Sequence, residues 1–416
     1  MTTRRTVLTL AGAGVAALAG GAVLAGRDEP AGRTAAPSAA VPDRLLVDTA
    51  SGLAVLDGRT SIPLGAAVPT PDGMRAYATA PAGAGRTGLR LLDLRSGGVL
   101  DRAELAGSWV PRVSSPDGDL VALTPSTAAH GRDHSTVLVS DARTTRYRVE
   151  LAGNYEPDAF GRSGVGLFVL DWLPPAAPDR YRVRLIDLAT GQPGPLYTRD
   201  KVPVPPGAEE EMRGQGRQAV YAPDRGTLFT LYTNQPDHLH TRDLVAGVKM
   251  TEANAFVHTL NVELGWAYCL DLPEPFGDGP AAGHTVAVTP DGRRLLVADH
   301  TSGKLAVADT ETLTVTSVVP VRVGVGSAAS AVSPDGGRLY LGIGSEIHVV
   351  DLTTLTEAAH WPAFGDVSGL TLSADGRRLL VGYPHAVGWF DPVAGTRLGR
   401  VDVPGLTWLR RTVPAI

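Results

Sequence analysis

Two recurring series of acidic turn residues run through most of this chain, and they constrain its fold more than any other feature. In the first series an apolar, strand-like run ends in Asp or Asn, at Asp57, Asp93, Asp141, Asp187, Asn261, Asp309, Asp351 and Asp391. In the second, Pro-Asp-Gly or a close relative stands between these marks, at Asp72, Asp117, Asp224, Asp291, Asp335 and Asp375. Proline presets φ, the Asp side chain bonds its own backbone and glycine accepts a positive φ, so the second series predicts tight hairpins.

The spacing of the marks predicts the architecture. The segments around them, such as 285–288 and 294–298, have strand length and are rich in β-branched and apolar residues. No helical periodicity is visible in the middle of the chain. Repeats at intervals of roughly 40 to 50 residues are typical of β-propeller blades. We therefore predict an all-β chain forming a single β-propeller of four-stranded blades, with strands a to d in each blade.

The marks divide the chain into seven complete blades, at 66–107, 108–153, 154–215, 216–282, 283–325, 326–364 and 365–404. Residues 45–64 supply strands b, c and d of one more blade, while residues 406–413 resemble an inner strand with no turn after it. We expect the C-terminal strand to complete the N-terminal blade, because closing the ring removes a free sheet edge. The count is then eight blades. Seven is the alternative, if 154–215 or the N-terminal stretch is not a full blade.

A family resemblance accompanies this pattern. Residues 295–319, LLVADHTSGKLAVADTETLTVTSVV, and residues 331–342, AVSPDGGRLYLG, resemble the YVTN-type repeats of secreted bacterial β-propellers. Those repeats belong to the larger WD-repeat-like and quinoprotein-dehydrogenase-like set. The resemblance covers 283–405 well and 108–282 weakly. It implies a propeller, most often seven-bladed in that family, and leaves function open because one such scaffold hosts binding proteins, lyases, lactonases and oxidoreductases.

The N-terminus predicts export. Arg4 and Arg5 precede an uncharged stretch rich in Ala, Gly, Leu and Val, so residues 1–25 are expected to be a signal. The Thr-Arg-Arg-Thr-Val-Leu run is similar to a twin-arginine signal, which exports folded proteins, and an ordinary secretory signal is the alternative. Cleavage after Ala25 would leave no membrane span, whereas a retained signal would act as an anchor. A secreted or cell-envelope location follows.

Composition narrows the partners. Residues 26–42 are rich in Pro, Ala and Gly and are expected to form a flexible linker, which leaves 43–416 as the propeller domain. A formal net charge of -5 without a basic run argues against nucleic acid. The single cysteine, Cys269, rules out an intrachain disulfide and is interpreted as a small buried residue rather than a nucleophile. We expect a monomer.

The predicted ligand site is the mouth of the central channel, where the d-to-a joints and b-to-c loops of a propeller converge. Aromatic, acidic, basic and amide side chains follow the joints, a mixture that suits a small polar molecule or a peptide end. The insertion 171–180 adds a further aromatic residue to the same face. The candidates are Trp109, Tyr155, Glu156, Arg217, Gln218, His284, Asp366 and Trp172. In the alternative interpretation Trp109 and Tyr155 plug the channel and the charged residues are solvated.

Histidines fall on the same predicted face and suggest a divalent or transition metal. The candidate ligands are His238, His240, His284 and His300. Imidazoles from several blades suit such a metal, and His238 and His240 on an extended segment point the same way. The alternative is that these loops simply collect polar residues. The run 202–211, VPVPPGAEEE, is interpreted as a joint with a solvated acidic patch, and 236–255 as a wall of the mouth.

The sequence therefore predicts an exported β-propeller that recognises a small molecule, a peptide or a partner protein at the channel mouth. The alternative is a hydrolase or lyase of the lactonase kind, using His and carboxylate groups at the same mouth, with or without a metal. Motifs of serine hydrolases, zinc proteases, phosphate-binding loops and c-type haem attachment are absent from the sequence. Whether the protein is an enzyme stays open at this point.

Overall fold

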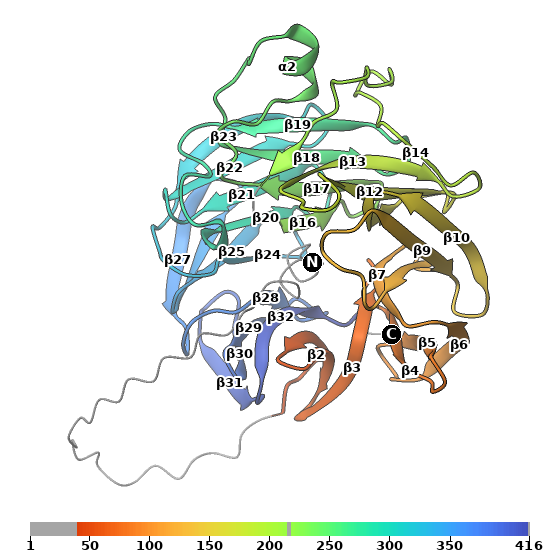
Figure 1. The fold of residues 1–416 in the computed structure, drawn as a ribbon. Coiled ribbons are helices and arrows are strands. Elements are labelled where there is room, and N and C mark those ends of the chain that lie inside the picture. Colours follow the sequence, from red (N-terminus) through yellow and green to blue (C-terminus); the bar gives the residue numbers. More distant parts are fainter. Residues whose placement is uncertain (1–39, 214–217, 415–416) are drawn as a thin grey trace, which may run out of the picture.

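The computed structural model describes residues 40–213 and 218–414, and within them the chain is almost entirely antiparallel β-sheet. The predicted signal, most of the predicted linker and Arg217 lie outside the described residues. Figure 1 shows the sheets set around a common centre, as predicted for the blades. No helix in the described ranges is both long and apolar enough to cross a membrane.

The first hydrogen-bonded sheet joins the two ends of the chain. Its strands, in order, are β32 (Leu406–Thr412), β1 (Leu45–Thr49), β2 (Gly52–Asp57), β3 (Thr60–Pro69), β4 (Arg75–Pro81), β5 (Arg86–Asp93) and β6 (Val99–Ala106). The long strand β3 belongs to two blades, because its first half pairs with β2 and its second half pairs with β4. Divided there, this sheet is two four-stranded blades.

The remaining strands form six further sheets. The third blade contains β7 (Trp109–Ser114), β8 (Val121–Pro125), β9 (His134–Ser140) and β10 (Thr145–Ala152). The fourth contains β11 (Asn154–Phe160), β12 (Gly166–Leu173), β13 (Arg180–Asp187) and β14 (Gln192–Gly194), with β15 (Met212–Arg213) also paired to β13. The fifth contains β16 (Gln218–Tyr221), β17 (Thr227–Tyr232), β18 (Ala255–Asn261) and β19 (Ala267–Leu272).

The last three blades are the most regular. They are β20 (His284–Val288), β21 (Arg294–Asp299), β22 (Lys304–Asp309) and β23 (Thr314–Pro320); β24 (Ala329–Val332), β25 (Arg338–Ile343), β26 (Glu346–Asp351) and β27 (Thr356–Pro362); and β28 (Leu370–Leu372), β29 (Leu379–Tyr383), β30 (Ala386–Phe390) and β31 (Arg397–Asp402). With the division at β3, the strands group into eight sets of four, in agreement with the larger of the two predicted counts.

The C-terminal strand completes the N-terminal blade. Strand β32 pairs antiparallel with β1, with Leu45 opposite Thr412 and Thr49 opposite Leu406. The blue C-terminal strands lie beside the red N-terminal ones in Figure 1. Inner strands of neighbouring blades pack side by side, as β28 does against β32 and β3 against β7. The pairing of β32 with β1 gives both strands a partner, as expected from the sequence.

Both series of turn residues behave as their chemistry predicts. In the Pro-Asp-Gly hairpins Gly73, Gly118, Gly292, Gly336 and Gly376 have positive φ. At the marks between strands c and d the side chain accepts backbone N–H groups two and three residues further on, as Asp309 does from Glu311 and Thr312. Asp57 is an exception, because its carboxylate pairs with Arg44.

Interdigitated side chains of adjacent blades form the core. One cluster joins the fourth and fifth blades through Phe168, Tyr181, Tyr232 and Phe256. The fifth blade is also where the structure departs from a pure β pattern. Its segment between β17 and β18 contains the short helix α2 (Thr241–Ala246), and a 3-10 turn, η2 (Ala281–Gly283), precedes β20. Propensity alone gave no sign of α2, which is only six residues long.

Candidate metal centre

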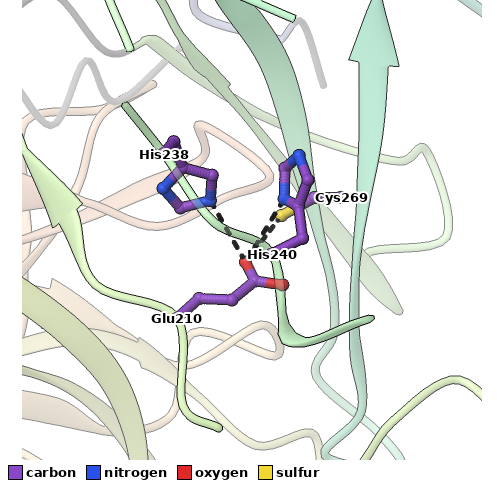
Figure 2. A group of neighbouring side chains, drawn as sticks. All are labelled: Glu210, His238, His240 and Cys269. Atoms are coloured by element: carbon purple, nitrogen blue, oxygen red, sulfur yellow. Dashed lines mark hydrogen bonds and ion pairs between the residues drawn. The ribbon is translucent and has the colours of Figure 1, made fainter. Parts of the chain in front are cut away.

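Four side chains that are able to bind a metal ion converge beside the fifth blade. They are Glu210, His238, His240 and Cys269, and one ligand atom from each lies within 4.8 Å of the others. We call these four residues the quartet. Figure 2 shows both imidazole rings and the thiol directed toward the Glu210 carboxylate. All three of the other residues are buried, and the Glu210 side chain is only 13% exposed.

Strand alternation and a short helix place three members of the quartet. Cys269 lies opposite His258 in the pairing of β19 with β18, and its side chain emerges on one face of β19. The two quartet histidines come from the segment between β17 and β18, just before α2. His240 caps that helix, and its backbone N–H donates to the buried carboxylate of Asp243 at 2.9 Å. The helix cap therefore fixes the backbone that carries His240.

An ion-pair clamp orients the fourth ligand. Glu209, next to Glu210 in the joint between the fourth and fifth blades, accepts from Arg184 at 2.7 and 2.9 Å and from Arg182 at 2.9 Å. Both arginines lie on β13 and also pair with the buried carboxylate of Asp171. With Glu209 held by β13, Glu210 is directed toward the histidines.

The Glu210 carboxylate has one anchored and one shared oxygen. Its Oε1 accepts the backbone N–H of Thr241 at 2.8 Å, at the start of α2. Its Oε2 accepts the Cys269 thiol at 2.9 Å and lies 3.7 Å from His238 Nε2 and 3.9 Å from His240 Nδ1. One oxygen is thus fixed by the backbone, and the other faces all three remaining ligand atoms.

A second carboxylate stands behind His240. His240 Nε2 lies 2.7 Å from Asp271 Oδ1, on the side of the ring away from Glu210. Asp271 lies two residues after Cys269 on β19, so both side chains emerge on the same face of the strand. The Asp271 carboxylate is held by Arg242 and by the Thr251 hydroxyl, which donates at 2.7 Å. A carboxylate behind a histidine fixes the tautomer and orientation that a metal requires.

The histidine rings pack on Phe256 and have buried nitrogens without hydrogen bonds among the described residues. The ring of His238 stacks on Phe256 with centroids 4.3 Å apart, and the ring of His240 meets Phe256 edge-on at 5.0 Å. Both nitrogens of His238 and Nδ1 of His240 are buried and make no hydrogen bond within the described part of the chain. Buried polar atoms are normally satisfied, so these nitrogens point to a missing partner.

The protonation equilibria of the cluster are strongly shifted. Burial opposes ionisation of Glu210, but interaction with the nearby rings of His238 and His240 holds the pKa of its carboxyl well below the ordinary value. Burial would lower the pKa of His240, yet its contacts with the carboxylates of Asp271 and Glu210 raise it to about 9. Burial and the neighbouring Glu210 charge raise the pKa of the Cys269 thiol well above its ordinary value. Without a metal, protons therefore occupy the quartet.

The donor set suits a borderline transition metal. Two imidazoles, one thiol and one carboxylate are the ligand types of Zn²⁺, whereas Mg²⁺ and Ca²⁺ prefer oxygen donors alone. Tetrahedral Zn²⁺ sets neighbouring donor atoms roughly 3.3 to 3.5 Å apart. From Glu210 Oε2 the observed separations are 2.9 Å to the thiol and 3.7 and 3.9 Å to the histidines. Shifts of about half an ångström would bring them to that geometry.

A pocket of about 470 Å³ reaches this cluster from the outer side of the fourth and fifth blades. Its walls include Leu196, Met212, Val245 and Tyr268 together with three members of the quartet, Glu210, His240 and Cys269. The walls are largely apolar apart from these ligands and a few charged residues. The pocket gives the ligand atoms a route to solvent.

Comparison with known proteins gives the fold and little more. No family model and no curated protein matches the chain. Among solved structures it is similar to the dihydro-heme d1 dehydrogenase NirN in complex with DHE, at 14% identity and a TM-score of 0.53, over 89% of this chain and 75% of that one. It is also similar to apo AztD from Citrobacter koseri, at 12% identity and a TM-score of 0.53, over 89% of this chain and 97% of that one. By its fold the chain is a β-propeller.

The propeller places three of the expected mouth aromatics inside its core. Trp109 packs between the second and third blades, and its Nε1 donates to the carbonyl of Ala106 at 2.6 Å. Tyr155 and Trp172 are likewise buried in inter-blade clusters. Trp172 lies within β12, so it is part of the sheet rather than of a loop around the mouth. Each of these rings packs against side chains of neighbouring strands.

The other predicted ligand-binding residues meet only in pairs, since Glu156 accepts from Trp172 Nε1 at 3.3 Å and Gln218 contacts His284. Glu156 lines a cavity in the centre of the propeller and pairs with Arg112 at 3.5 Å. Gln218 Nε2 donates to the backbone carbonyl of His284 at 2.6 Å. Asp366 is exposed on the connection between the last two blades. The structure therefore does not bring the seven described candidates together as one surface, and Arg217 lies outside the described residues.

The predicted set of four histidines is also not brought together. Of the four, only His238 and His240 join a group of metal-ligating side chains in the described ranges. His284 is wholly buried, with Nε2 3.2 Å from Asp299 Oδ2. His300 is buried with Nδ1 3.1 Å from the carbonyl oxygen of Arg322.

The other two quartet residues, Glu210 and Cys269, were not predicted from the sequence as metal ligands. Cys269 is buried as expected, but its neighbours are metal-ligating groups and not only apolar ones. The run 202–211 is not a solvated acidic patch, because Glu209 is ion-paired and Glu210 faces into the quartet. The available signal was the triplet of glutamates in a joint next to the blade that holds both His238-x-His240 and the only cysteine.

Proposed function

We propose that this β-propeller is a metal-binding protein that holds one divalent transition metal, Zn²⁺ by chemistry, at Glu210, His238, His240 and Cys269. The observation that supports it most directly is the buried quartet with a carboxylate behind one of its histidines. That arrangement combines a complete ligand set with a carboxylate placed behind one histidine, as metal-binding histidines usually have.

The quartet favours binding over hydrolysis. Structural zinc sites use four protein ligands, whereas catalytic ones use three and keep one position for water or substrate. Here four side chains from three separate segments already supply four donors. A metal held this way has no open position for a hydrolytic water. The structural neighbours are propellers too, and NirN is described as a complex with DHE.

Binding of the metal would displace protons that the cluster now holds. Zn²⁺ binds cysteine as the thiolate, so the proton that Cys269 shares with Glu210 would leave. His240 would give up the proton on Nδ1 and keep its contact with Asp271 through Nε2. The buried charges of Glu210 and the thiolate would then be offset by the metal itself.

The proposal includes an extracytoplasmic location. Arg4 and Arg5 with the uncharged stretch after them are the basis for export, and the twin-arginine pattern would carry a folded, metal-loaded propeller across the membrane. Loading before export would let the cell select the metal that enters the quartet. Fractionation of cells that express the full-length chain, with and without Arg4→Lys and Arg5→Lys, tests this part.

The metal site is tested by titrating chelator-treated protein with Zn²⁺ and with Co²⁺. We expect one equivalent of either ion to bind, with a thiolate-to-cobalt charge-transfer absorption that Cys269→Ser removes. His360→Gln is the matched control, because that histidine is 54% exposed and lies outside the quartet. Absence of saturable binding, or a cobalt spectrum unchanged by Cys269→Ser, would contradict the proposed function. Mg²⁺ should not compete, because it prefers oxygen ligands.

A further inference from the structure

A second cavity lies in the central channel, away from the quartet. It has a volume of about 400 Å³ and is lined by inner strands of the first five blades, among them β32, β3, β7, β11 and β16. Residues of two a-to-b hairpins, Asp72 and Arg225, help to line it. The quartet is built from a b-to-c segment and a d-to-a joint, and antiparallel pairing puts those connections at the opposite end of the strands. The two sites therefore belong to opposite faces.

Irregularities of the inner strands direct charged side chains to this cavity. The pairing of β32 with β1 skips Arg410, that of β7 with β8 skips Arg112, and that of β11 with β12 skips Asp158. All three skipped residues line the cavity. The inner strands β16, β20, β24 and β28 pair without such a skip. Bulges of this kind re-aim a side chain and are frequent next to functional sites.

The arginines that line the cavity differ in whether a carboxylate pairs with their charge. Arg410 is paired with Asp48 at 2.8 Å and Arg112 with Glu156 at 3.5 Å. Arg225 and Arg411 instead donate to backbone carbonyls, of Pro116 at 2.7 Å and of Pro71 at 3.0 Å.

Within the described part of the chain, no ion pair within 4.0 Å involves Arg225 or Arg411. Asp72 follows Pro71, whose carbonyl binds Arg411, but the Asp72 carboxylate already accepts hydrogen bonds from the Thr70 hydroxyl and the Met74 N–H of its own hairpin. Burial lowers the pKa of Arg411, as expected for a cation with weak compensation. The charge of Asp72 offsets only part of this burial, and neither Arg225 nor Arg411 has a close ion-pair partner among the described residues.

We infer that the channel cavity is a binding site for a small organic monocarboxylate, held by Arg225 and Arg411. Guanidinium groups bind carboxylates through paired, charge-assisted hydrogen bonds. The walls also carry Leu46, Val68 and Val220, which suit an aliphatic body, and the volume lies within the usual range for small-molecule sites. The carboxylates of the wall, Glu156 and Asp158, disfavour a ligand with several negative charges. This inference does not depend on the metal site.

Ligand-observed NMR and calorimetry with linear monocarboxylates of two to six carbons, and with their uncharged amides, test the inference. We expect at least one acid to bind saturably while its amide does not. Arg225→Asn and Arg411→Gln should each weaken the binding by at least about tenfold, because each removes a charge-assisted contact. The asparagine is chosen because residue 225 has a positive φ, which asparagine tolerates.

Arg148→Gln on the outer strand β10 is the control, since its guanidinium pairs with Glu150 on the exposed side of the blade. It should bind the acid as the wild type does. Circular dichroism and thermal unfolding of each variant show whether the propeller is folded, and if Arg411→Gln does not fold, Arg225→Asn alone carries the test. Failure of every acid to bind, equal binding of acids and amides, tighter binding of inorganic phosphate, or binding unchanged in the folded variants would each overturn the inference.

Discussion

Replacing Asp271 tests the metal site through a residue that would not touch the metal. Its carboxylate lies 2.7 Å from His240 Nε2 and is itself held by the Thr251 hydroxyl at 2.7 Å and by Arg242. Burial raises the pKa of Asp271, but hydrogen bonds and charge from His240 outweigh this and keep it below the ordinary value. Asp271 is therefore ionised at neutral pH and supports a histidine directed at the quartet.

The magnitude follows from comparable outer-shell carboxylates, whose loss costs about 10- to 100-fold in metal affinity. Asp271→Asn keeps an oxygen that can accept from Nε2 and removes only the charge, so we expect the lower end, about tenfold or about 1.4 kcal/mol. Asp271→Ala also releases the ring and should reach about 100-fold, or about 2.7 kcal/mol. A competition titration of Zn²⁺ against a chromophoric chelator measures both.

Asp278→Asn is the matched control, because that carboxylate accepts from Asn254 at 2.7 Å and does not join the quartet. It should bind Zn²⁺ as the wild type does. If Asp271→Ala bound Zn²⁺ with unchanged affinity, His240 would not be a ligand, and the argument from the carboxylate behind it would fail.

Four further predictions follow from the described contacts. Zn²⁺ must displace protons from Cys269 and from His240, whose pKa is about 9. The affinity of the protein for Zn²⁺ should therefore rise with pH between about 6 and 8. An affinity that did not change with pH would contradict the proposed ligands. Glu209→Gln should weaken Zn²⁺ binding by several-fold although Glu209 is not a ligand, because it weakens the ion pairs with Arg182 and Arg184 that orient Glu210. The control Glu150→Gln on β10 should leave Zn²⁺ binding unchanged. Asp299→Asn should lower the free energy of unfolding by about 2 kcal/mol. Burial raises the pKa of Asp299, but hydrogen bonds from His284, Ser302 and Thr301 outweigh it and lower this pKa, so the contribution is complete above about pH 4 and declines progressively as the pH falls through the lowered pKa. A difference between wild type and variant that was as large at about pH 2 as at about pH 6 in urea titrations would refute it. Deletion of residues 406–416 should remove β32, leave β1 as an open edge and cause aggregation that light scattering detects. A shortened chain that stayed monomeric with unchanged thermal stability would show that the pairing of β32 with β1 contributes little to stability.

The fold was predictable because its signals are local and repeated. A Pro-Asp-Gly turn needs only four consecutive residues, and an Asp that accepts N–H groups two and three positions further on needs only those neighbours. Five of the predicted turn glycines take the positive φ that this chemistry requires. In the fifth blade the sequence Ala-Pro-Asp-Arg gives the left-handed position to Arg225, and the turn forms all the same.

The site was less predictable because it depends on which face of a strand a residue occupies and on how a joint crosses between blades. Nothing local separates Glu209 from Glu210, yet one is clamped to β13 and the other faces two histidines. The rule that propeller ligands gather at the channel mouth placed Trp109 and Tyr155 at a surface, whereas their size fills the space between blades. His238 and His240 were identified because an alternating pattern on one segment is itself local.

The pairing of β32 with β1 sets the order of events during synthesis. Asp48 and Arg410, which form an ion pair across these strands, are 362 residues apart. At roughly 5 to 20 residues per second the ribosome needs about 20 to 70 s to make the intervening chain. Until then the first blade lacks its inner strand, so the N-terminal segment must wait, partly unassembled, for the last residues to arrive. A cell that makes this protein has to keep that nascent edge from aggregating for the whole interval, and only a finished chain pairs β32 with β1.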